Sequence, residues 1–477
     1  MKNRRRRGRK SYHVVGMCIT LIQLLLSIAF LVLAGKNGMI PGKYLIPMGI
    51  VLVVLFGVAF GLQFLRGNGY IAGLVISIIV DLVLGVGIFS VYKADKLLGD
   101  VGGATYKTDN MVVVVRADDP AETLMDAKEY RYGIQTSLDA ENTNKMLEDV
   151  QKSVGRTVKV QEYGTLQEEA EALLWGRVDA AIYNEAMTSV LEESIDDYSS
   201  QVKILYQYGI ETEIAKEEKN VEEPFNVYIS GIDVSGAIST TSRSDVNIIM
   251  TVNPETRKIL LTSTPRDYYV PIPSVSGEQR DKLTHAGIYG VDKSMETLEN
   301  LYGIDISYYA RVNFTSLMTI VDALGGVDVQ SDYEFEAGGF HFNQGVNHLD
   351  GKAALAFSRE RYSFKDGDNQ RGRNQEAVLT AILNKAMSPA ILMNASSIIS
   401  SVSNSVETNM TSDEMAKFIN MQLSEGGSWQ IESMAAVGNG DTQTCFSSGA
   451  QPLYVMWPDE ASVAGISQKM QQILSGQ

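Results

Sequence analysis

Three long apolar runs near the N-terminus constrain this chain more than any other feature of its sequence. They extend over Val14 to Ala34, Tyr44 to Leu65 and Tyr70 to Tyr92. Each has about the 20 apolar residues that a helix needs to cross a bilayer. The first run is too long for a signal-peptide core and lacks a small-residue cleavage site, so we expect all three to be retained. Asp81, inside the third run, is either functional or a structural residue that faces a neighbouring helix.

A cluster of basic residues before the first run predicts the orientation in the membrane. Residues 4–7 are all arginine, and Arg9 and Lys10 follow them. The positive-inside rule keeps this cluster in the cytoplasm, and three crossings then place the large C-terminal part outside the cell. A nucleic-acid-binding arm is the alternative interpretation, but a membrane span begins only a few residues later. We therefore predict a multi-pass protein of the cell membrane with an extracytoplasmic C-terminal part.

The charge balance narrows the classes of partner. The formal net charge is −16, although the basic arm at the N-terminus is positive, so the remainder of the chain is more acidic still. An acidic surface does not suit nonspecific binding of polyanions, and we expect no nucleic-acid partner. A phosphate site must then be a local cluster of arginines. The two cysteines, Cys18 and Cys445, lie in a membrane span and in the C-terminal part, so we expect no disulfide between them.

The chain of 477 residues is long enough for two or three folded units. We predict a basic arm and three transmembrane helices over 1–92, a linker over 93–110, an accessory α/β domain over 111–222 and a larger α/β domain over 223–477. In the accessory domain, strand-like runs at Met111–Val115 and Asp179–Tyr183 alternate with helical patterns at Leu138–Val154 and Leu166–Leu174. The fold class expected for both domains is α/β.

Two stretches of the accessory domain resemble half of a periplasmic solute-binding domain. They are Tyr132-Gly-Ile-Gln-Thr-Ser and residues 172–183. A structural or partner-docking insert is the alternative, and the sequence names no ligand. The acidic stretch Glu211 to Glu223 then separates this domain from the next, as charge runs often do.

The larger domain begins with strand-like runs at Asn226–Ile232, Val246–Val252 and Ile259–Ser263, and helical patterns follow at Ser294–Tyr302 and Phe314–Leu324. The segment after residue 390 contains few motifs. We assign it to the completion of this domain, with helices expected at 413–423 and 461–474.

Arginines at the ends of predicted elements are the main chemical signal. In Phe357-Ser-Arg-Glu-Arg-Tyr, an extended backbone would send Arg359 and Arg361 to the same face. Asp368 is positioned to cap a helix in which Arg371 and Gln375 lie four residues apart on one face. Arg243 and Arg266 add positive charge at strand ends, and the planar guanidinium matches phosphate oxygens bidentately. Surface salt bridges with nearby acids are the alternative for any one arginine alone.

Two aspartates are the candidate ligands of a divalent cation beside such a pyrophosphate site. Asp233 and Asp245 each end or begin an apolar strand-like run, so both can lie at one edge of a sheet. Mg²⁺ prefers one or two carboxylates together with phosphate oxygens of the substrate. Turn formation is the alternative role of an aspartate flanked by glycine.

Residues 225–390 resemble the catalytic domain of the LytR-CpsA-Psr family. The segments that carry the resemblance follow in the family's order: Gly231-Ile-Asp-Val-Ser-Gly, Arg243-Ser-Asp-Val-Asn, Ser263-Thr-Pro-Arg-Asp, Lys282-Leu-Thr-His-Ala-Gly, Asp322-Ala-Leu-Gly-Gly-Val-Asp-Val, Phe357-Ser-Arg-Glu-Arg-Tyr and Gly367-Asp-Asn-Gln-Arg-Gly-Arg-Asn-Gln. The resemblance implies a central sheet with a hydrophobic tunnel for a polyprenyl tail. It also implies a Mg²⁺-dependent phosphotransferase that moves an anionic glycopolymer, such as teichoic acid or capsule, from polyprenyl pyrophosphate to peptidoglycan.

The family's functional residues map onto this chain one by one. Asp233 and Asp245 resemble its Mg²⁺-associated carboxylates, and Arg243, Arg266, Arg359, Arg361, Arg371 and Gln375 resemble its pyrophosphate-binding set. Lys282 is an addition to that set, and Asp245, Arg243, Arg266 and Arg361 are the expected catalytic residues. We interpret His285 as structural, because no partner for it is evident in the sequence.

Two functions of other classes compete with the transferase. The family has been described as transcriptional attenuators, but this chain has no helix-turn-helix pattern, and its matched domain is expected outside the membrane, away from DNA. A sensor or binding module built on the accessory domain is the second alternative. Turnover of a lipid-linked substrate separates the enzyme from this second alternative.

Overall fold

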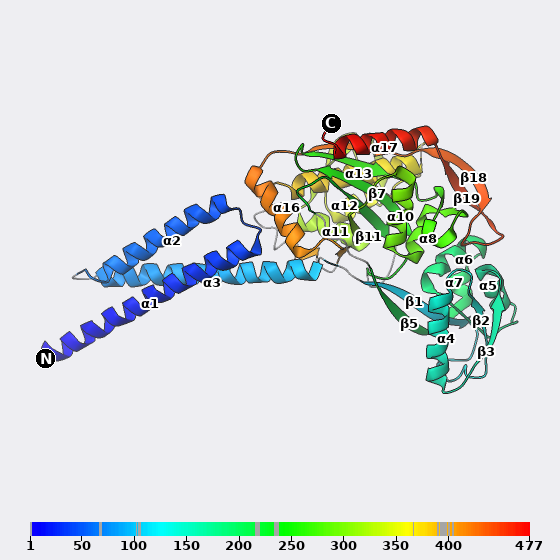
Figure 1. Ribbon diagram of the computed structural model, residues 1–477, viewed down its shortest axis with the longest axis horizontal. Coiled ribbons are helices and arrows are strands. Elements are labelled where there is room, and N and C mark those ends of the chain that lie inside the picture. The colour runs from blue at the N-terminus through cyan, green and yellow to red at the C-terminus, as the bar shows by residue number, and fades with distance from the viewer. Residues whose placement is uncertain are drawn as a thin grey trace.

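Three helices at the N-terminus project from the rest of the molecule (Figure 1). The computed structural model describes residues 2–65, 69–101, 103, 106–214, 220–232, 238–365, 367–388, 391, 398, 401–402 and 405–477. The helices are α1 (Lys2–Asn37), α2 (Gly42–Leu62) and α3 (Gly69–Val101). Their segments Val14–Asn37, Gly42–Leu62 and Gly69–Lys93 are long and apolar enough to cross a membrane. These segments coincide with the three predicted runs.

The connection between α1 and α2 lies against the folded part of the chain. Met39 packs on Ala416 and Ile419 of α16 (Ser412–Glu425). The Asn420 amide donates a hydrogen bond to the Gly38 carbonyl at 2.6 Å, and the Lys43 ammonium donates one to the Ser424 carbonyl. The C-terminal end of α1 and the N-terminal end of α2 therefore lie on the same side of the helical bundle as the two sheets.

The first unit is a five-stranded sheet in the order β3-β2-β4-β1-β5. The long strands β1 and β5 are antiparallel, and β2 pairs in parallel with β3 and β4. Its elements are β1 (Tyr106–Arg116), β2 (Arg131–Gln135), α4 (Ala140–Val154), β3 (Lys159–Tyr163), α5 (Leu166–Leu174), β4 (Ala180–Asn184), η1 (Glu185–Met187), α6 (Thr188–Ser194), α7 (Tyr198–Gln201) and β5 (Val202–Glu213).

Helices cover both faces of this sheet. On one face, Met146 and Val150 of α4 pack with Val113 of β1. On the other, Leu173 of α5 and Leu191 of α6 belong to the same buried cluster as neighbouring residues of β1. Helix α5 begins where the Thr165 hydroxyl and the Glu168 carboxylate form a capping box. The first unit is thus an α/β layer structure.

The predicted linker over 93–110 is shorter in the structure. Helix α3 extends to Val101, and β1 begins at Tyr106, where Tyr106 pairs with Glu213 at the far end of β5. The sequence pattern missed this extension because only the C-terminal half of β1, Met111–Val115, forms an apolar run. Strand β1 also forms a bridge from Thr108 to Thr240, so it connects the two units directly.

The second unit is built on a six-stranded mixed sheet in the order β16-β11-β6-β7-β8-β17. Its strands are β6 (Phe225–Ile232), β7 (Ser244–Asn253), β8 (Lys258–Ser263), β11 (Tyr308–Asn313), β16 (Val406–Thr408) and β17 (Gln430–Ala435). The main helices are α10 (Val291–Tyr302), α11 (Phe314–Ala323), α12 (Gly351–Arg359), α13 (Asp368–Ala386), α16 and α17 (Glu460–Leu474). The expected α/β class is confirmed, and β16 and β17 show that the C-terminal segment completes this sheet.

Shorter elements connect these strands and helices. They are β9 (Tyr269–Pro271), α8 (Pro273–Ser276), β10 (Arg280–Lys282), α9 (Leu283–Ala286), η2 (Gly287–Tyr289), β12 (Val327–Ser331), β13 (Phe335–Ala337), β14 (Phe340–Phe342), β15 (Gly345–Leu349), β18 (Gly438–Thr444) and β19 (Pro452–Pro458). The strands among them form four two-stranded sheets, β9 with β10, β12 with β15, β13 with β14 and β18 with β19.

Successive residues of the six-stranded sheet are buried on opposite faces, as the alternation of a strand requires. Tyr228, Ile249 and Leu260 face α10 and α17. Their neighbours Val227, Ile248 and Leu261 belong to the cluster that contains side chains of α13 and α16. This three-layer arrangement places the start of β7, the end of β8 and the N-terminus of α13 next to one another, and these termini carry most of the candidate residues.

Candidate functional site

A small polar pocket lies where β7 begins, β8 ends and α13 begins. Its volume is about 40 Å³, and the lining includes Asp245, Arg266, Asp267, Arg371 and Gln375. Four of the residues predicted from the sequence thus meet at one place. The pocket combines positive charge with carboxylates, which suits an anion together with a cation.

Asp245 and Arg266 form the central ion pair of this pocket. The Arg266 Nη1 donates a hydrogen bond to Asp245 Oδ1 at 2.7 Å, and both side chains are about a quarter exposed, at 29% and 24%. The Arg266 Nε also lies 3.8 Å from Asp267 Oδ2. Each partner therefore keeps a solvent-facing part that a ligand can reach.

Arg371 and Gln375 line the pocket from α13, four residues apart on one helix. The helix starts differently from the prediction, in which Asp368 was the cap. Gly367 occupies the N-cap position with a φ of 48°, and Asp368 is the first helical residue. A left-handed turn favours glycine, so the chain enters the helix one residue earlier than the capping pattern indicated.

An apolar cavity adjoins the polar pocket. Its volume is about 110 Å³, and it is lined mainly by aliphatic side chains of β6, β7, α11 and α13, with Ser358, Arg359 and Gln375 as polar members. Val246 and Gln375 line both spaces. Gly231 lines the apolar cavity, and a Cβ there would lie 2.6 Å from the Val246 Cβ, so only glycine allows β6 and β7 this approach.

The prediction that Arg359 and Arg361 lie on a strand is wrong. Arg359 is the last residue of α12, whose Asp350 cap accepts a hydrogen bond from Ala353 and whose apolar residues repeat with helical spacing. The Arg359 guanidinium stacks on the Phe314 ring at 4.2 Å, and Arg361 stacks on Tyr362. Arg359 thus borders the apolar cavity, whereas Arg361 is not among the lining residues of either space.

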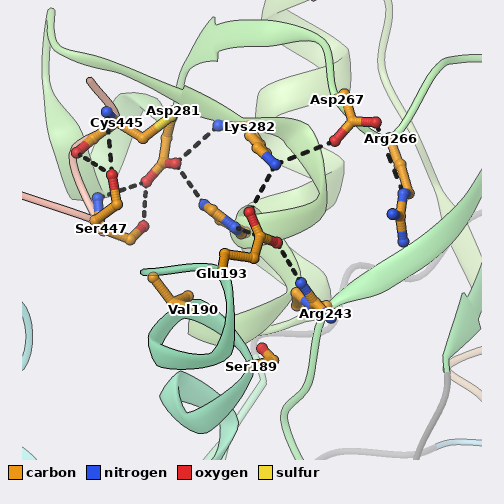
Figure 2. A network of polar contacts seen from close by, with 12 residues as sticks. Ser189, Val190, Glu193, Arg243, Arg266, Asp267, Asp281, Lys282, Cys445 and Ser447 are labelled. Atoms are coloured by element: carbon orange, nitrogen blue, oxygen red, sulfur yellow. Dashed lines mark hydrogen bonds and ion pairs between the residues drawn. The ribbon is translucent and has the colours of Figure 1, made fainter. Parts of the chain in front are cut away.

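Arg243 and Lys282 share a carboxylate partner from the first unit, as Figure 2 shows. Glu193 of α6 accepts a hydrogen bond from Arg243 Nη1 at 2.5 Å and one from Lys282 Nζ at 2.7 Å. Lys282 also lies 3.4 Å from Asp267 and is only 7% exposed. Because Asp267 also approaches Arg266, one chain of ion pairs runs from the first unit into the polar pocket.

Close backbone packing fixes the position of Arg243. A Cβ on Gly287 would lie 2.6 Å from the Ser242 carbonyl and 2.9 Å from the Ser244 amide, so the segment 242–244 rests directly on the glycine. A larger residue at 287 would force this segment to shift and would disturb the contact between Arg243 and Glu193.

His285 has partners that the sequence did not reveal. Its Nδ1 lies 2.6 Å from Asp281 Oδ1, and its Nε2 lies 3.8 Å from Glu193 Oε1. The other Asp281 oxygen accepts hydrogen bonds from the Ser447 amide and hydroxyl. His285 and Asp281 are fully buried, which agrees with a structural role for the histidine.

The surroundings of Glu193 and His285 favour the charged form of each side chain. Burial opposes ionisation of Glu193, but hydrogen bonds and charge from His285 and Lys282 outweigh it and hold the pKa of the carboxyl well below its usual range. Burial likewise opposes protonation of His285, but the Asp281 and Glu193 carboxylates raise its pKa above the usual value. A negative Glu193 therefore lies beside a histidine with an increased tendency to be positive.

A buried carboxyl lies just behind the pocket. Glu376 of α13 accepts a hydrogen bond from the Ser263 amide at 3.0 Å and is 3% exposed. Burial raises its pKa to about 7 against the opposing effect of that hydrogen bond and of Arg373. No motif or spacing in the sequence distinguishes Glu376 from other glutamates.

The expected metal site is described in part. Asp245 lines the pocket, while Asp233 lies outside the described residues. Among the described residues, no group of three or more His, Cys, Asp or Glu side chains has a metal-binding arrangement. Mg²⁺ often takes only one or two carboxylates and completes its shell with water and phosphate oxygens, so Asp245 fits this pattern.

The sequence analysis missed Glu193 and Asp281, and it considered Asp267 only as one of the nearby acids that could form a surface salt bridge with an arginine. The spacing of Asp281 and His285, four residues apart, was a usable signal, because such residues meet on one turn of a helix. Asp267 directly follows the predicted Arg266. Nothing in the sequence connects Glu193 to residues about 50 and 90 positions away, because this contact depends on how the two units pack.

The profile of the LytR_cpsA_psr family matches residues 189–470. A relative from Bacillus mycoides (strain KBAB4), the polyisoprenyl-teichoic acid–peptidoglycan teichoic acid transferase TagU, is 38% identical over 208 residues, which are 43% of this chain and 66% of the relative. The protein of the same name from Enterococcus faecalis (strain ATCC 700802 / V583) is 35% identical over 224 residues, 46% of this chain and 73% of the relative.

Solved structures give matches of similar extent. The crystal structure of B. subtilis TagV is 26% identical and covers 53% of this chain and 98% of its own, with a TM-score of 0.46. A structure of TagT bound to LI-WTA is 26% identical and covers 55% and 94%, with a TM-score of 0.43.

Proposed function

Because the chain belongs to the LytR_cpsA_psr family, we propose that it transfers an anionic glycopolymer from a polyprenyl-pyrophosphate carrier to peptidoglycan. The names of the TagU relatives describe transfer of teichoic acid from a polyisoprenyl carrier to peptidoglycan. The chain spans about two thirds to three quarters of the length of these relatives. The chemical class of the reaction is therefore the transfer of a phosphorus-containing group during cell-wall assembly.

One observation carries this proposal: an apolar cavity and a polar, arginine-lined pocket share Val246 and Gln375. A polyprenyl pyrophosphate has the same division, with an apolar tail joined directly to a charged head. The tail would enter the cavity between the sheet, α11 and α13, and the pyrophosphate would lie in the pocket. A cavity of about 110 Å³ would hold only the first part of such a tail.

The residues of the pocket would bind and polarise the pyrophosphate. Arg266, Arg371 and Gln375 line it directly, and the planar guanidinium groups match phosphate oxygens in a bidentate way. Arg243 and Lys282 lie behind them and are connected to the pocket through Asp267. Arg359 contributes at the mouth of the apolar cavity, where it stacks on Phe314.

In the reaction, a sugar hydroxyl of peptidoglycan attacks the phosphorus that carries the polymer. A new P–O bond forms, the bond to the bridging oxygen breaks, and polyprenyl phosphate leaves with the bonding electrons. Arginines next to these oxygens stabilise the negative charge that develops on them. Asp245 would accept the proton of the hydroxyl, because it is the more exposed of the two carboxylates that line the pocket.

Asp245, together with Asp233, would hold Mg²⁺ against the phosphate oxygens. When bound, the ion supplies Lewis-acid stabilisation of charge at the phosphorus. The proposal rests on the carboxylate chemistry of the pocket and on the preference of Mg²⁺ for few protein ligands.

The three apolar helices support a multi-pass location in the cell membrane. The basic residues before the first span would remain in the cytoplasm. The connection between α1 and α2 and the sheets would then lie together outside, which agrees with the contacts of Met39 with α16. In this orientation the site faces the compartment that contains peptidoglycan.

Transfer by the full-length protein in lipid nanodiscs tests the proposal. A synthetic polyprenyl-pyrophosphate donor and peptidoglycan oligomers are supplied with Mg²⁺, and release of polyprenyl phosphate is measured together with polymer attachment. Arg266→Ala should lower the rate by about 10²–10³-fold, the usual loss when one preorganised charge donor is removed. Arg266→Lys should recover part of it, because a point charge cannot replace the bidentate fork.

Arg156→Ala is the matched control. Arg156 makes an exposed ion pair with Glu129 in the first unit, so its loss should leave the rate unchanged. A wild-type protein that binds the donor without any turnover would instead favour a sensor or binding module. A normal rate for Arg266→Ala would contradict the assignment of the pocket.

A further inference from the structure

A cleft much larger than the apolar cavity and the polar pocket lies between the two units. The proposed binding of the donor does not use it. Its volume is about 910 Å³. One wall comes from β1, β4, β5 and α6 of the first unit, and the other from the segment 239–245 that leads into β7. The lining residues are Thr108, Asn110, Val112, Val114, Tyr183, Glu185, Ala186, Thr188, Ser189, Glu192, Ser199, Val202, Ile204, Gln207, Ser239, Thr240, Thr241, Ser242, Arg243 and Asp245.

The walls of this cleft offer hydroxyl and amide groups above an apolar floor. Eight serine and threonine residues contribute hydroxyls to the lining. The amides of Asn110 and Gln207 add to them, and both donate a hydrogen bond to Glu185 Oε2, at 3.4 Å and 2.9 Å. Hydroxyl and amide groups both donate and accept hydrogen bonds. Val112 and Tyr183 are buried beneath them, and Ile204 is 51% exposed. This combination suits a sugar, which has hydroxyls at its edges and apolar C–H faces.

The charge of the cleft distinguishes between two kinds of sugar polymer. Glu185, Glu192 and Asp245 are acidic, and Arg243 is the one basic residue among the described lining residues. A polymer with a phosphate in every repeat would be repelled along this surface. The glycan backbone of peptidoglycan carries no phosphate groups, so the acceptor fits the cleft better than the donor polymer does.

The position of the cleft also fits an acceptor. Asp245 lines both the cleft and the polar pocket, while the pocket meets the apolar cavity at Val246 and Gln375. The apolar cavity proposed for the lipid, the polar pocket proposed for the pyrophosphate and the cleft therefore follow one another in this order. In-line displacement at phosphorus requires the attacking oxygen to approach opposite the leaving group. A glycan in the cleft would approach from the side opposite the lipid.

We propose that the cleft between the two units binds the peptidoglycan glycan strand and presents one of its hydroxyls to Asp245. This inference rests on the proposed function and adds a role for the first unit: it supplies half of the acceptor site. The first unit would thereby determine which acceptor is used, without any contact with the lipid.

Two variants of the full-length protein in nanodiscs test the assignment. Gln207→Ala removes an amide from the exposed wall, and Ser189→Trp places a large ring in the cleft near Arg243, where Figure 2 shows Ser189 on α6. Their matched controls are Gln201→Ala and Ser200→Trp, which change exposed residues outside the cleft. Thermal unfolding checks that each variant is folded. The measured quantities are the KM for a peptidoglycan oligosaccharide and the KM for the polyprenyl-pyrophosphate donor.

We expect the acceptor KM to rise about tenfold in Gln207→Ala, the loss of roughly one good hydrogen bond, and further in Ser189→Trp. The donor KM of Gln207→Ala and both KM values of the two controls should remain at wild-type values. A rise in the donor KM of Gln207→Ala instead would assign the cleft to the donor sugars and overturn the proposal. Unchanged acceptor values in both folded variants would overturn it as well.

Failure of the proposed function is distinguishable from failure of this inference. If the wild-type protein does not transfer polymer, binding of the same oligosaccharide is measured directly by saturation-transfer NMR. If Ser189→Trp abolishes binding of the oligosaccharide and Ser200→Trp retains it, the result would support a glycan-binding cleft even without polymer transfer. Absence of binding, or equal binding by both variants, would refute it.

Discussion

Glu193→Gln separates the role of the first unit from that of the pocket itself. The change keeps the shape of the side chain and removes one negative charge. In the wild-type cluster, three basic residues (Arg243, Arg266 and Lys282) meet three acidic ones (Glu193, Asp245 and Asp267), so these charges cancel. The variant leaves one excess positive charge beside the place proposed for the pyrophosphate. We therefore predict tighter donor binding.

The size of the effect follows from the geometry. At a separation on the order of 6 Å and an effective dielectric constant of about 20 to 40, one unit charge contributes about 1 to 3 kcal/mol. Glu193 and Arg243 are 23% and 25% exposed, so solvent screening favours the lower value. The donor KM should fall by about tenfold. Stability should fall by about 1 to 2 kcal/mol, because Lys282 loses one partner and keeps Asp267.

The assay is donor saturation with full-length protein in nanodiscs at two salt concentrations. The decrease in the donor KM should be smaller at high salt, because salt screens the interaction between exposed charges. Glu148→Gln, on the exposed face of α4, removes the same charge far from the cluster and should change nothing. An unchanged or higher donor KM in Glu193→Gln would refute the reasoning and show instead that Glu193 holds Arg243 and Lys282 in a productive position.

Three further predictions address the metal, the orientation and the buried carboxyl. Asp245→Ala should abolish transfer without unfolding the protein, and wild-type activity of this variant across a Mg²⁺ titration would contradict the metal assignment. A cysteine in place of Ser200 should react with a membrane-impermeant maleimide in intact cells, whereas protection of a folded protein would place the sheets in the cytoplasm. Glu376→Gln should stabilise the protein above pH 7 by about 3 kcal/mol and have no effect below pH 4.5, as measured by unfolding at each pH. The sign follows because burial raises the pKa of Glu376 to about 7 in the folded state. The wild-type protein therefore has its full stability below the usual pKa of a glutamate and loses part of it as the pH rises through 7, whereas the glutamine variant does not.

Regular local patterns made much of the fold predictable. Helix α5 begins and ends at the residues that the sequence indicated, because a capping box and an apolar stripe both specify it. Strands β6, β7 and β8 were recognisable as apolar runs, and Asp245 and Arg266 at the ends of β7 and β8 line one pocket. Arg371 and Gln375 were predicted from their helical spacing, and they line the same pocket from α13.

Other features depended on information that local patterns do not contain. The stretch around Arg359 reads equally well as a strand or a helix over a few residues, and the cap at Asp350, nine positions earlier, decides for a helix. The start of α13 depended on the left-handed conformation of Gly367. Glu193 could not be predicted at all, because its contacts with Arg243 and Lys282 form only when the two units pack.

The boundary predicted at residue 223 lies between the two sheets, but the family match extends across it. The family match begins at residue 189, so it includes α6, α7 and β5 although they pack in the first unit. Strand β5 pairs along β1 over nearly its whole length, and Leu191 and Tyr198 are buried against the sheet that β1 belongs to. A chain that began at residue 189 would expose these side chains and the paired edge of β5. The residues before 189 therefore stabilise the helix that carries Glu193, and through Glu193 they fix the charges next to the pocket.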